Sequence, residues 1–134
     1  FIVDDNSQDG TASMALEHAR ADPKVVVIQR PRKLGLGSAY RIGFRIAMDF
    51  GNDLILEMDA DMSHNPKYII KFLHLMKYHR FGIVLGSRYC KGGSIKYLSS
   101  VRRFISYVAN FIARTLLGIR ETMDVTSGFK LFDA

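Results

Sequence analysis

The sequence has little cysteine: Cys90 is the single one among 134 residues. This excludes an internal disulfide and a zinc site built from several cysteines, and it is typical of a reducing compartment. No uninterrupted apolar stretch reaches the roughly 20 residues with which a helix spans a bilayer. Internal repeats and low-complexity segments are also missing. With 48% hydrophobic and 11% aromatic residues, the chain has the composition of a folded globular domain.

Acidic residues are missing from residues 88–120, although this segment holds seven of the 19 lysines and arginines. The remaining residues carry twelve basic and thirteen acidic side chains, so the net charge of +6 belongs to this one segment. A local excess of positive charge favours an anionic partner that binds there. Nucleic acid is not the expected partner, because the chain has no groove-entering motif and its basic helix is broadly apolar.

Short apolar runs alternate with helical patterns along the chain. We expect strands at residues 1–3, 25–28, 54–58 and 83–85, and a closing loop and strand within 124–132. We expect helices at residues 11–21, 38–50, 66–78 and 99–117. This alternation predicts an α/β fold with a mainly parallel sheet flanked by helices. Both ends of the sequence are abrupt, so we expect a domain truncated at both ends.

Two carboxylates, Asp59 and Asp61, directly follow the expected strand 54–58, with Ala60 between them. Neighbouring carboxylates repel each other unless a cation lies between them. Mg²⁺ binds one or two carboxylates and completes its shell with phosphate oxygens and water. The triplet therefore predicts a divalent cation bridging to a diphosphate, and the alternative is a solvated acidic turn.

Three further polar clusters follow expected strands: Asp4 with Asp5, then Arg30, and then Arg88. Ligands of open α/β sheets bind beyond the carboxyl ends of the strands. We therefore expect the four clusters to converge at one edge of the sheet. A strand-end carboxylate such as Asp5 can accept hydrogen bonds from a nucleobase or ribose, although its segment could equally be a turn with a helix cap.

Two basic segments are candidate phosphate sites. Lys33 and Gly35 precede the expected helix 38–50, whose N-terminus attracts phosphate through its dipole and unpaired amides. The glycines there could instead serve helix–sheet packing, and the segment matches neither a P-loop nor Gly-x-Gly-x-x-Gly. Arg88 can bind phosphate through its planar guanidinium fork, or it can pair with a neighbouring acid.

The expected helix 99–117 is unusual because its polar residues occupy one stripe and nearly all other positions are apolar. At about 100° per residue, the stripe is about 120° wide and holds Arg102, Arg103, Ser106, Asn110 and Arg114. Two interpretations remain open. The helix is either mostly buried with a cationic stripe facing water, or it lies at a membrane surface where the stripe receives an anionic headgroup.

Six blocks of the sequence, in this order and spacing, resemble the polyprenol-phosphate (dolichol-phosphate) mannose synthases of glycosyltransferase family 2. The blocks contain Val3-Asp4-Asp5-Asn6-Ser7, Gly35-Leu36-Gly37, Met58-Asp59-Ala60-Asp61, Gly86-Ser87-Arg88-Tyr89, Arg102…Ser106…Asn110 and Asp124…Thr126-Ser127-Gly128-Phe129. The resemblance implies a nucleotide-diphospho-sugar transferase (GT-A) fold with a Rossmann-like sheet. It also implies that residues 1–134 are part of a catalytic domain, without the family's first strand and its C-terminal part. That strand is central in the family, so we expect a gap in the sheet.

The resemblance implies an inverting, metal-dependent enzyme that transfers mannose from GDP-mannose to a polyprenyl phosphate, with Mg²⁺ or Mn²⁺ as cofactor. The implied metal ligands are Asp59 and Asp61, and the implied catalytic residues are Asp61, Arg88 and Arg102. The implied substrate-binding residues are Asp4, Asp5, Lys33, Gly35, Asp59, Ala60, Asp61, Arg88, Arg102 and Ser106. The two aspartates of the first block would contact the nucleoside, and the two arginines would grip the acceptor phosphate. The implied location is the cytoplasmic face of a membrane, peripheral or anchored through regions outside this chain.

Two alternative functions remain open. A related family 2 enzyme could make another glycosyl phosphoryl lipid, for example from UDP-glucose. Ser63 and His64 are similar to the mannose synthases, whereas the glucosyl-lipid enzymes tend to carry glutamine there; His64 is otherwise interpreted as a loop histidine. Outside the family, a phosphorelay receiver also begins with a strand ending in Val-Asp-Asp-Asn, but the Asp59 and Asp61 pair has no place in one.

Overall fold

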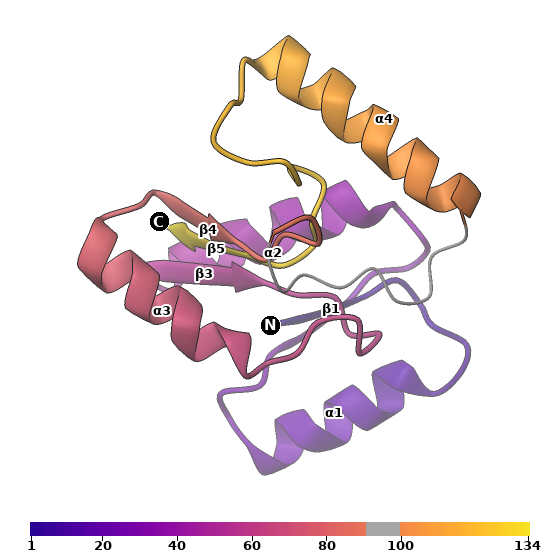
Figure 1. Cartoon of the computed structure of the whole chain (residues 1–134). Helices are drawn as coiled ribbons and strands as arrows, with labels where there is room; N and C mark the ends of the chain where they lie inside the picture. Colours follow the sequence, from indigo (N-terminus) through magenta and orange to yellow (C-terminus); the bar gives the residue numbers. More distant parts are fainter. Residues whose placement is uncertain (91–99) are drawn as a thin grey trace. The chain divides into compact units, whose positions relative to one another are not determined.

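The computed structural model describes residues 1–90 and 100–134, apart from the side chains of residues 100, 102 and 103. The chain forms two compact units, which are residues 1–55 with Ala134, and residues 56–133. Figure 1 shows the helices and strands of both units.

The first unit is built on two parallel strands and two helices. Its elements are β1 (Ile2–Asp4), α1 (Thr11–Ala21), β2 (Val27–Gln29) and α2 (Leu36–Asp49). Asp4 lies opposite Gln29 in the ladder, so Asp5 and Arg30 both leave the strand pair at its carboxyl end. The helix α1 begins next to Asp9, whose Oδ1 accepts hydrogen bonds from the Thr11 amide and hydroxyl at 3.0 and 2.6 Å.

The second unit contains most of a three-stranded sheet and two helices. Its elements are β3 (Leu54–Glu57), which runs across the boundary between the units, α3 (Tyr68–His79), β4 (Ile83–Leu85), α4 (Ser100–Leu117) and β5 (Lys130–Asp133). The strand order is β3-β5-β4, and β5 runs antiparallel to β4. The expected mainly parallel sheet therefore carries an antiparallel pair, because β5 returns beside β4 with Leu85 opposite Lys130.

The core of the second unit forms between α3 and this sheet. Phe72 and Met76 lie one turn apart on α3 and pack against Val84, Phe129 and Leu131. All five side chains are buried, and each contributes about 1.5–3 kcal/mol through removal of its apolar surface from water. The core thus holds α3, which follows the loop after β3, against β4 and β5.

The predicted elements are confirmed in kind, and their boundaries shift by up to two residues. The second strand is Val27–Gln29 instead of 25–28, because the Val25 amide donates to the Asp22 carbonyl in a turn. The third helix begins at Tyr68 instead of at Pro66, after a turn closed by Asn65.

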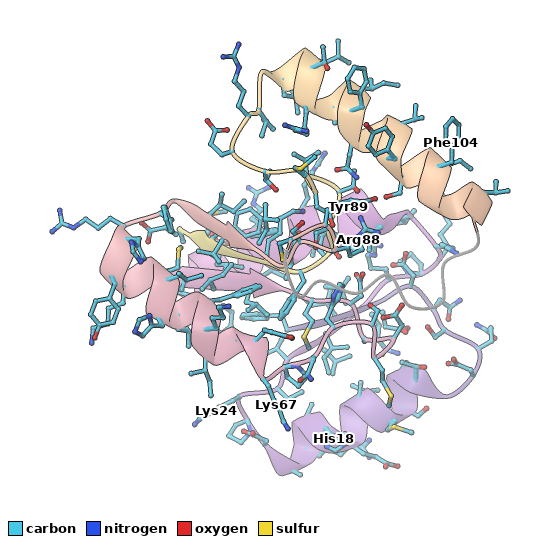
Figure 2. The ribbon with its side chains drawn as sticks, in the orientation of Figure 1. His18, Lys24, Lys67, Arg88, Tyr89 and Phe104 are labelled. Atoms are coloured by element: carbon cyan, nitrogen blue, oxygen red, sulfur yellow. The ribbon has the colours of Figure 1, made fainter. Side chains whose placement is uncertain are left out.

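The exposure of α4 contradicts the interpretation that this helix is mostly buried. Its apolar side chains are exposed: Val101, Phe104, Ile105, Tyr107, Phe111, Ile112, Leu116 and Leu117. Among the side chains described for α4, the buried one is polar, since Asn110 is only 3% exposed, and Figure 2 shows Phe104 projecting away from its unit. No helix in the described part of the chain is both long and apolar enough to cross a membrane.

Replacing Phe72 with alanine should destabilise the protein by about 3–5 kcal/mol, because the substitution empties the middle of the α3 core cluster. The matched control is Ile70→Ala on the same helix, whose side chain is 76% exposed and should change stability by less than about 0.5 kcal/mol. Urea unfolding followed by circular dichroism measures both. Equal losses in the two variants would contradict the described core.

Candidate functional site

In the first unit, an ion pair between Asp5 and Arg30 organises the loop before α2. Arg30 is buried; its Nε donates to Asp5 Oδ1, its Nη1 to Ser38 Oγ at 2.6 Å and its Nη2 to the Gly35 carbonyl at 3.3 Å. The Leu34 amide donates to Asp5 Oδ2 at 3.2 Å. The hydrogen bond from Arg30 lowers the pKa of Asp5, which therefore stays ionised at neutral pH. Asp5 thus holds the loop, and its predicted contact with a nucleoside stays a prediction.

Asp4 and Gly35 are also local organisers. Asp4 is 4% exposed, and its Oδ2 accepts a hydrogen bond from the Ser7 amide at 3.1 Å. Gly35 has φ 90° and ψ 150°, a conformation that side chains disfavour, so the glycine sets the direction in which the chain enters α2. Lys33 lies near enough to Asp5 to contribute to its lowered pKa. The phosphate site expected at this helix start stays a prediction.

In the second unit, the first acid of the triplet is packed against backbone. A Cβ added to Gly128 would lie 2.5 Å from Asp59 Oδ2 and 3.0 Å from its Cγ and Oδ1. Contacts this short are not tolerated, so only glycine at position 128 leaves room for the Asp59 carboxylate. The loop before β5 therefore determines where this carboxylate lies.

His64 contacts the same carboxylate. Its Nε2 lies 3.2 Å from Asp59 Oδ2, and its ring stacks on Phe129 with centroids 5.0 Å apart. Phe129 in turn contacts Phe72 of the core at 4.6 Å between centroids. His64 lies in the loop between β3 and α3, as interpreted from the sequence, but its side chain is only 16% exposed and contacts both Asp59 and Phe129.

The second acid, Asp61, is exposed and held in a tight turn. Met62 has φ 63°, which is uncommon for a residue with a side chain, and the turn brings the Ser63 amide within 2.9 Å of Asp61 Oδ1. Hydrogen bonds from the Ser63 side chain and amide lower the pKa of Asp61. Asp61 is therefore an accessible, ionised carboxylate at neutral pH.

The carboxylates of the second unit fit a hard divalent cation whose coordination shell is completed mostly by water and phosphate oxygens. No group of three or more histidine, cysteine or acidic side chains among the described residues could enclose a metal ion. Mg²⁺ and Mn²⁺ do not need such a group, because one or two carboxylates suffice when water and phosphate oxygens complete the shell. Asp59 and Asp61 would be those carboxylates, with Ala60 separating them.

Arg88 is held by a buried carboxylate at the end of β4. Asp124 is fully buried and pairs with Arg88 at 2.7 Å between Oδ1 and Nη2 and at 2.9 Å between Oδ2 and Nε. The Arg88 amide also donates to Asp124 Oδ2 at 2.9 Å. Arg88 thus forms an ion pair with a neighbouring acid, one of the two alternatives left open by the sequence. Its side chain keeps 29% of its surface exposed.

Polar residues connect this ion pair to α4. Thr126 Oγ1 accepts hydrogen bonds from Arg88 Nη2 at 3.1 Å and from Asn110 Nδ2 at 2.9 Å. One turn earlier on α4, Ser106 Oγ lies 3.1 Å from the Tyr89 hydroxyl. Figure 2 shows Arg88 and Tyr89 on the side of the β4–β5 strands that faces α4. Ser106 and Asn110 of the helix stripe therefore face their own unit.

The predicted site residues are divided between the two units. Asp4, Asp5, Lys33 and Gly35 gather in the first unit, and Asp59, Ala60, Asp61, Arg88 and Ser106 belong to the second. The side chain of Arg102 lies outside the described residues. The convergence of all four strand-end clusters at one edge stays a prediction.

Sequence reasoning missed the residues that hold the site residues in place. Asp124 and Gly128 belong to a recognised block, but no spacing rule links them to Arg88 and Asp59, which lie far away along the chain. The available signal for Asp124 was that residues 88–120 contain no acid, so an acid soon after this segment is a candidate partner for Arg88. The pairing of Arg30 with Asp5 could also have been inferred, since both follow neighbouring strands.

The sequence matches the Glycosyl transferase family 2 profile over residues 1–134. The chain belongs to glycosyltransferase family 2. Membership in this family confirms the α/β GT-A class expected from the six blocks and rules out the phosphorelay receiver.

Two relatives of known name are similar over essentially the whole chain. An undecaprenyl-phosphate mannosyltransferase of Micrococcus luteus is 38% identical over 134 residues, which are 100% of this chain and 54% of that protein. A polyprenol monophosphomannose synthase of Mycolicibacterium smegmatis is 39% identical over 133 residues, 98% of this chain and 49% of that protein. This family 2 chain therefore spans about half the length of these relatives.

Gly128→Ala should destabilise the family 2 chain by about 1–3 kcal/mol, because the new methyl group displaces the Asp59 carboxylate. Gly82→Ala is the matched control: its added Cβ meets nothing within 4 Å, and it should change stability by less than about 1 kcal/mol. Thermal unfolding compares the two variants. A Gly128→Ala protein as stable as the control would show that the two loops are not in contact.

The ion pair predicts a pH dependence of stability. Burial opposes ionisation of Asp124, but the hydrogen bonds from Arg88 outweigh it and lower the pKa of Asp124 from its ordinary 3.8. A lowered pKa stabilises the fold above the unfolded value, and this stabilisation is lost as pH falls through the folded value. The stability gap between wild type and Asp124→Asn should therefore be constant above about pH 5 and shrink below about pH 4. Urea unfolding at pH 7, 5, 4 and 3 measures the gap; a gap that stays constant down to pH 3 would contradict the pairing.

Proposed function

We propose that this chain is part of the catalytic domain of an inverting, metal-dependent enzyme that transfers mannose from GDP-mannose to a polyprenyl phosphate. The observation that carries the proposal is that the second unit holds two kinds of charged group, a pair of acids and an arginine. Two neighbouring carboxylates, Asp59 and Asp61, suit a cation with a diphosphate, and a fixed arginine, Arg88, suits a second phosphate. The two relatives, which are named for mannose transfer to lipid phosphates, support the choice of sugar and acceptor.

The donor diphosphate is the expected partner of the acidic pair. Mg²⁺ or Mn²⁺ held there would neutralise the negative charge that develops on the departing GDP. Asp61 contributes an ionised and accessible carboxylate, and Asp59 contributes one whose position is fixed by Gly128 and His64. In the first unit, Asp4 and Asp5 are proposed to contact the nucleoside, and Lys33 and Gly35 to lie near its phosphates.

The acceptor needs positioning more than it needs a base. A phosphate monoester has its second pKa near 6, so its oxygen is already anionic near neutral pH. Arg88, together with Arg102 and Ser106, is proposed to hold this phosphate and direct the oxygen at the anomeric carbon of the sugar. Attack from the face opposite the leaving diphosphate inverts the configuration and gives a β-linked mannosyl phosphate lipid.

The lipid part of the acceptor has a suitable surface next to Arg88. A cavity of about 140 Å³ adjoins Tyr89 and is lined by Tyr107, Asn110, Phe111, Arg114 and Met123. Its apolar and aromatic lining suits the first carbon atoms of a polyprenyl chain. The exposed apolar face of α4 lies on the same unit and suits the boundary between lipid headgroups and acyl chains. We place this surface at the cytoplasmic face of a membrane.

Transfer of glucose from UDP-glucose is the weaker alternative. Ser63 and His64 follow the acidic triplet as in the mannose synthases, and His64 is built into the Asp59 site by stacking on Phe129. A glutamine, typical of the glucosyl-lipid enzymes at this point, is not found after the triplet. Comparison of GDP-mannose and UDP-glucose as donors for the full-length protein decides between the two.

Asp61→Asn should reduce mannose transfer to a polyprenyl phosphate by about 100-fold or more at saturating Mn²⁺, because the charge that holds the cation is lost. The matched control is Asp53→Asn, which removes an exposed acid from the opposite end of β3 and should change the rate less than about twofold. Radiolabelled GDP-mannose and organic extraction of the product lipid measure transfer by the full-length protein. Retained turnover in Asp61→Asn would remove the metal-bridge assignment.

A further inference from the structure

Among the side chains that the structure describes in the second unit, Asp124 is fully buried and has a full set of partners, and the proposed mechanism does not use it. Oδ1 accepts hydrogen bonds from Arg88 Nη2 at 2.7 Å and Thr126 Oγ1 at 3.4 Å. Oδ2 accepts hydrogen bonds from the Arg88 amide and Nε, both at 2.9 Å. Each oxygen is thus occupied twice, so the carboxylate has neither solvent access nor a free position from which to take a proton from a substrate.

We propose that Asp124 is a positioning residue that fixes the Arg88 guanidinium for the phosphate of the lipid acceptor. The inference rests on the proposed function, because it assigns a purpose to the arginine of that site. The carboxylate acts through Arg88 and does not touch the substrate.

The geometry of the pair leaves one part of the guanidinium for a ligand. Nε and Nη2 face Asp124, and Nη2 also reaches Thr126. Among the described residues, none accepts a hydrogen bond from Nη1. The Arg88 amide also donates to Asp124, so the carboxylate holds both the backbone and the guanidinium of Arg88. The long arginine side chain therefore loses its rotational freedom before the ligand binds.

A second contact keeps the carboxylate itself in place. Asn110 donates from Nδ2 to Thr126 Oγ1 at 2.9 Å and accepts from the Thr126 amide at 3.2 Å. Asn110 is 3% exposed, so this pair of bonds anchors the loop that carries Asp124 to α4. Arg88 is therefore connected to α4 through Thr126, which it contacts both directly and by way of Asp124. Hydrogen bonding with Asp124 also raises the pKa of Arg88, which keeps the guanidinium charged throughout the physiological range.

A double-mutant cycle tests whether Asp124 acts through Arg88. In the full-length protein, Asp124→Asn should lower kcat/KM for the polyprenyl phosphate about 30-fold or more, while the dissociation constant of GDP-mannose changes less than about twofold. In the Arg88→Ala background the same substitution should change kcat/KM less than about twofold. A further large loss in that background would overturn the proposal, because it would mean that Asp124 acts independently of the arginine.

A matched control separates positioning from simple loosening of the loop. Ser127 is 3% exposed, donates to the Gly86 carbonyl at 2.7 Å and accepts from the Phe129 amide at 3.3 Å, but it does not contact Arg88. Ser127→Ala removes two hydrogen bonds from the same loop and should leave the KM for the acceptor within about twofold of wild type. An equal rise of this KM in Ser127→Ala and Asp124→Asn would overturn the proposal. If Arg88→Ala does not fold, because it leaves a buried charge without a partner, Arg88→Gln replaces it in the cycle.

A binding measurement distinguishes failure of this inference from failure of the proposed function. The probe is farnesyl phosphate, titrated calorimetrically into wild type, Asp124→Asn and Arg88→Gln without a donor. Weaker binding in both variants, by similar factors, supports the positioning role even if the wild type transfers no mannose. Transfer by the wild type, combined with additive losses in the cycle, overturns the positioning role and leaves the function standing. A wild type that neither transfers mannose nor binds the probe overturns both.

Discussion

A fully buried carboxylate is stable in a protein only when a charge and enough donors compensate it, and Arg88 does this for Asp124. This one pair joins the end of β4 to the loop before β5, and through Thr126 and Asn110 it joins that loop to α4. The apolar side of α4 is largely exposed, so a few polar contacts determine how the helix sits within its unit. The placement of α4 within the second unit therefore depends on polar and charged contacts, whereas α3 is held by the apolar core.

The short segment 124–129 contacts both Arg88 and Asp59, the two kinds of residue on which the proposed reaction depends. At its start Asp124 holds the arginine, and near its end Gly128 leaves room for the Asp59 carboxylate. Phe129 then joins the core and carries His64, which contacts the same carboxylate. The acid proposed to bind a cation and the arginine proposed to bind a phosphate are thus both contacted by one short segment of the chain. This explains in physical terms why the chain has glycine between a serine and a buried aromatic residue at this point.

The sequence predicted best where the pattern is local. The four helices and the strand β4 follow from periodicity and apolar runs, and the acidic triplet falls at a strand end as expected. Contacts between distant segments, such as Arg88 with Asp124, are a matter of tertiary packing and leave no periodic trace. The orientation of α4 was also hidden, because helical periodicity shows that two faces differ but not which one faces the protein. Here the small polar residues Ser106 and Asn110 face inward, since they find hydrogen-bond partners in Tyr89 and Thr126.

The central claim is that the acidic pair binds a cation while Arg88, still paired with Asp124, is directed at a phosphate. The most direct measurement is a crystal structure of the full-length protein with Mn²⁺, GDP and a prenyl phosphate, in which anomalous scattering locates the metal. We predict Mn²⁺ bound directly to Asp59 and Asp61, and the prenyl phosphate on Arg88 with the Asp124 pair intact. Mn²⁺ located away from both aspartates, or a prenyl phosphate bound away from Arg88, would contradict the account.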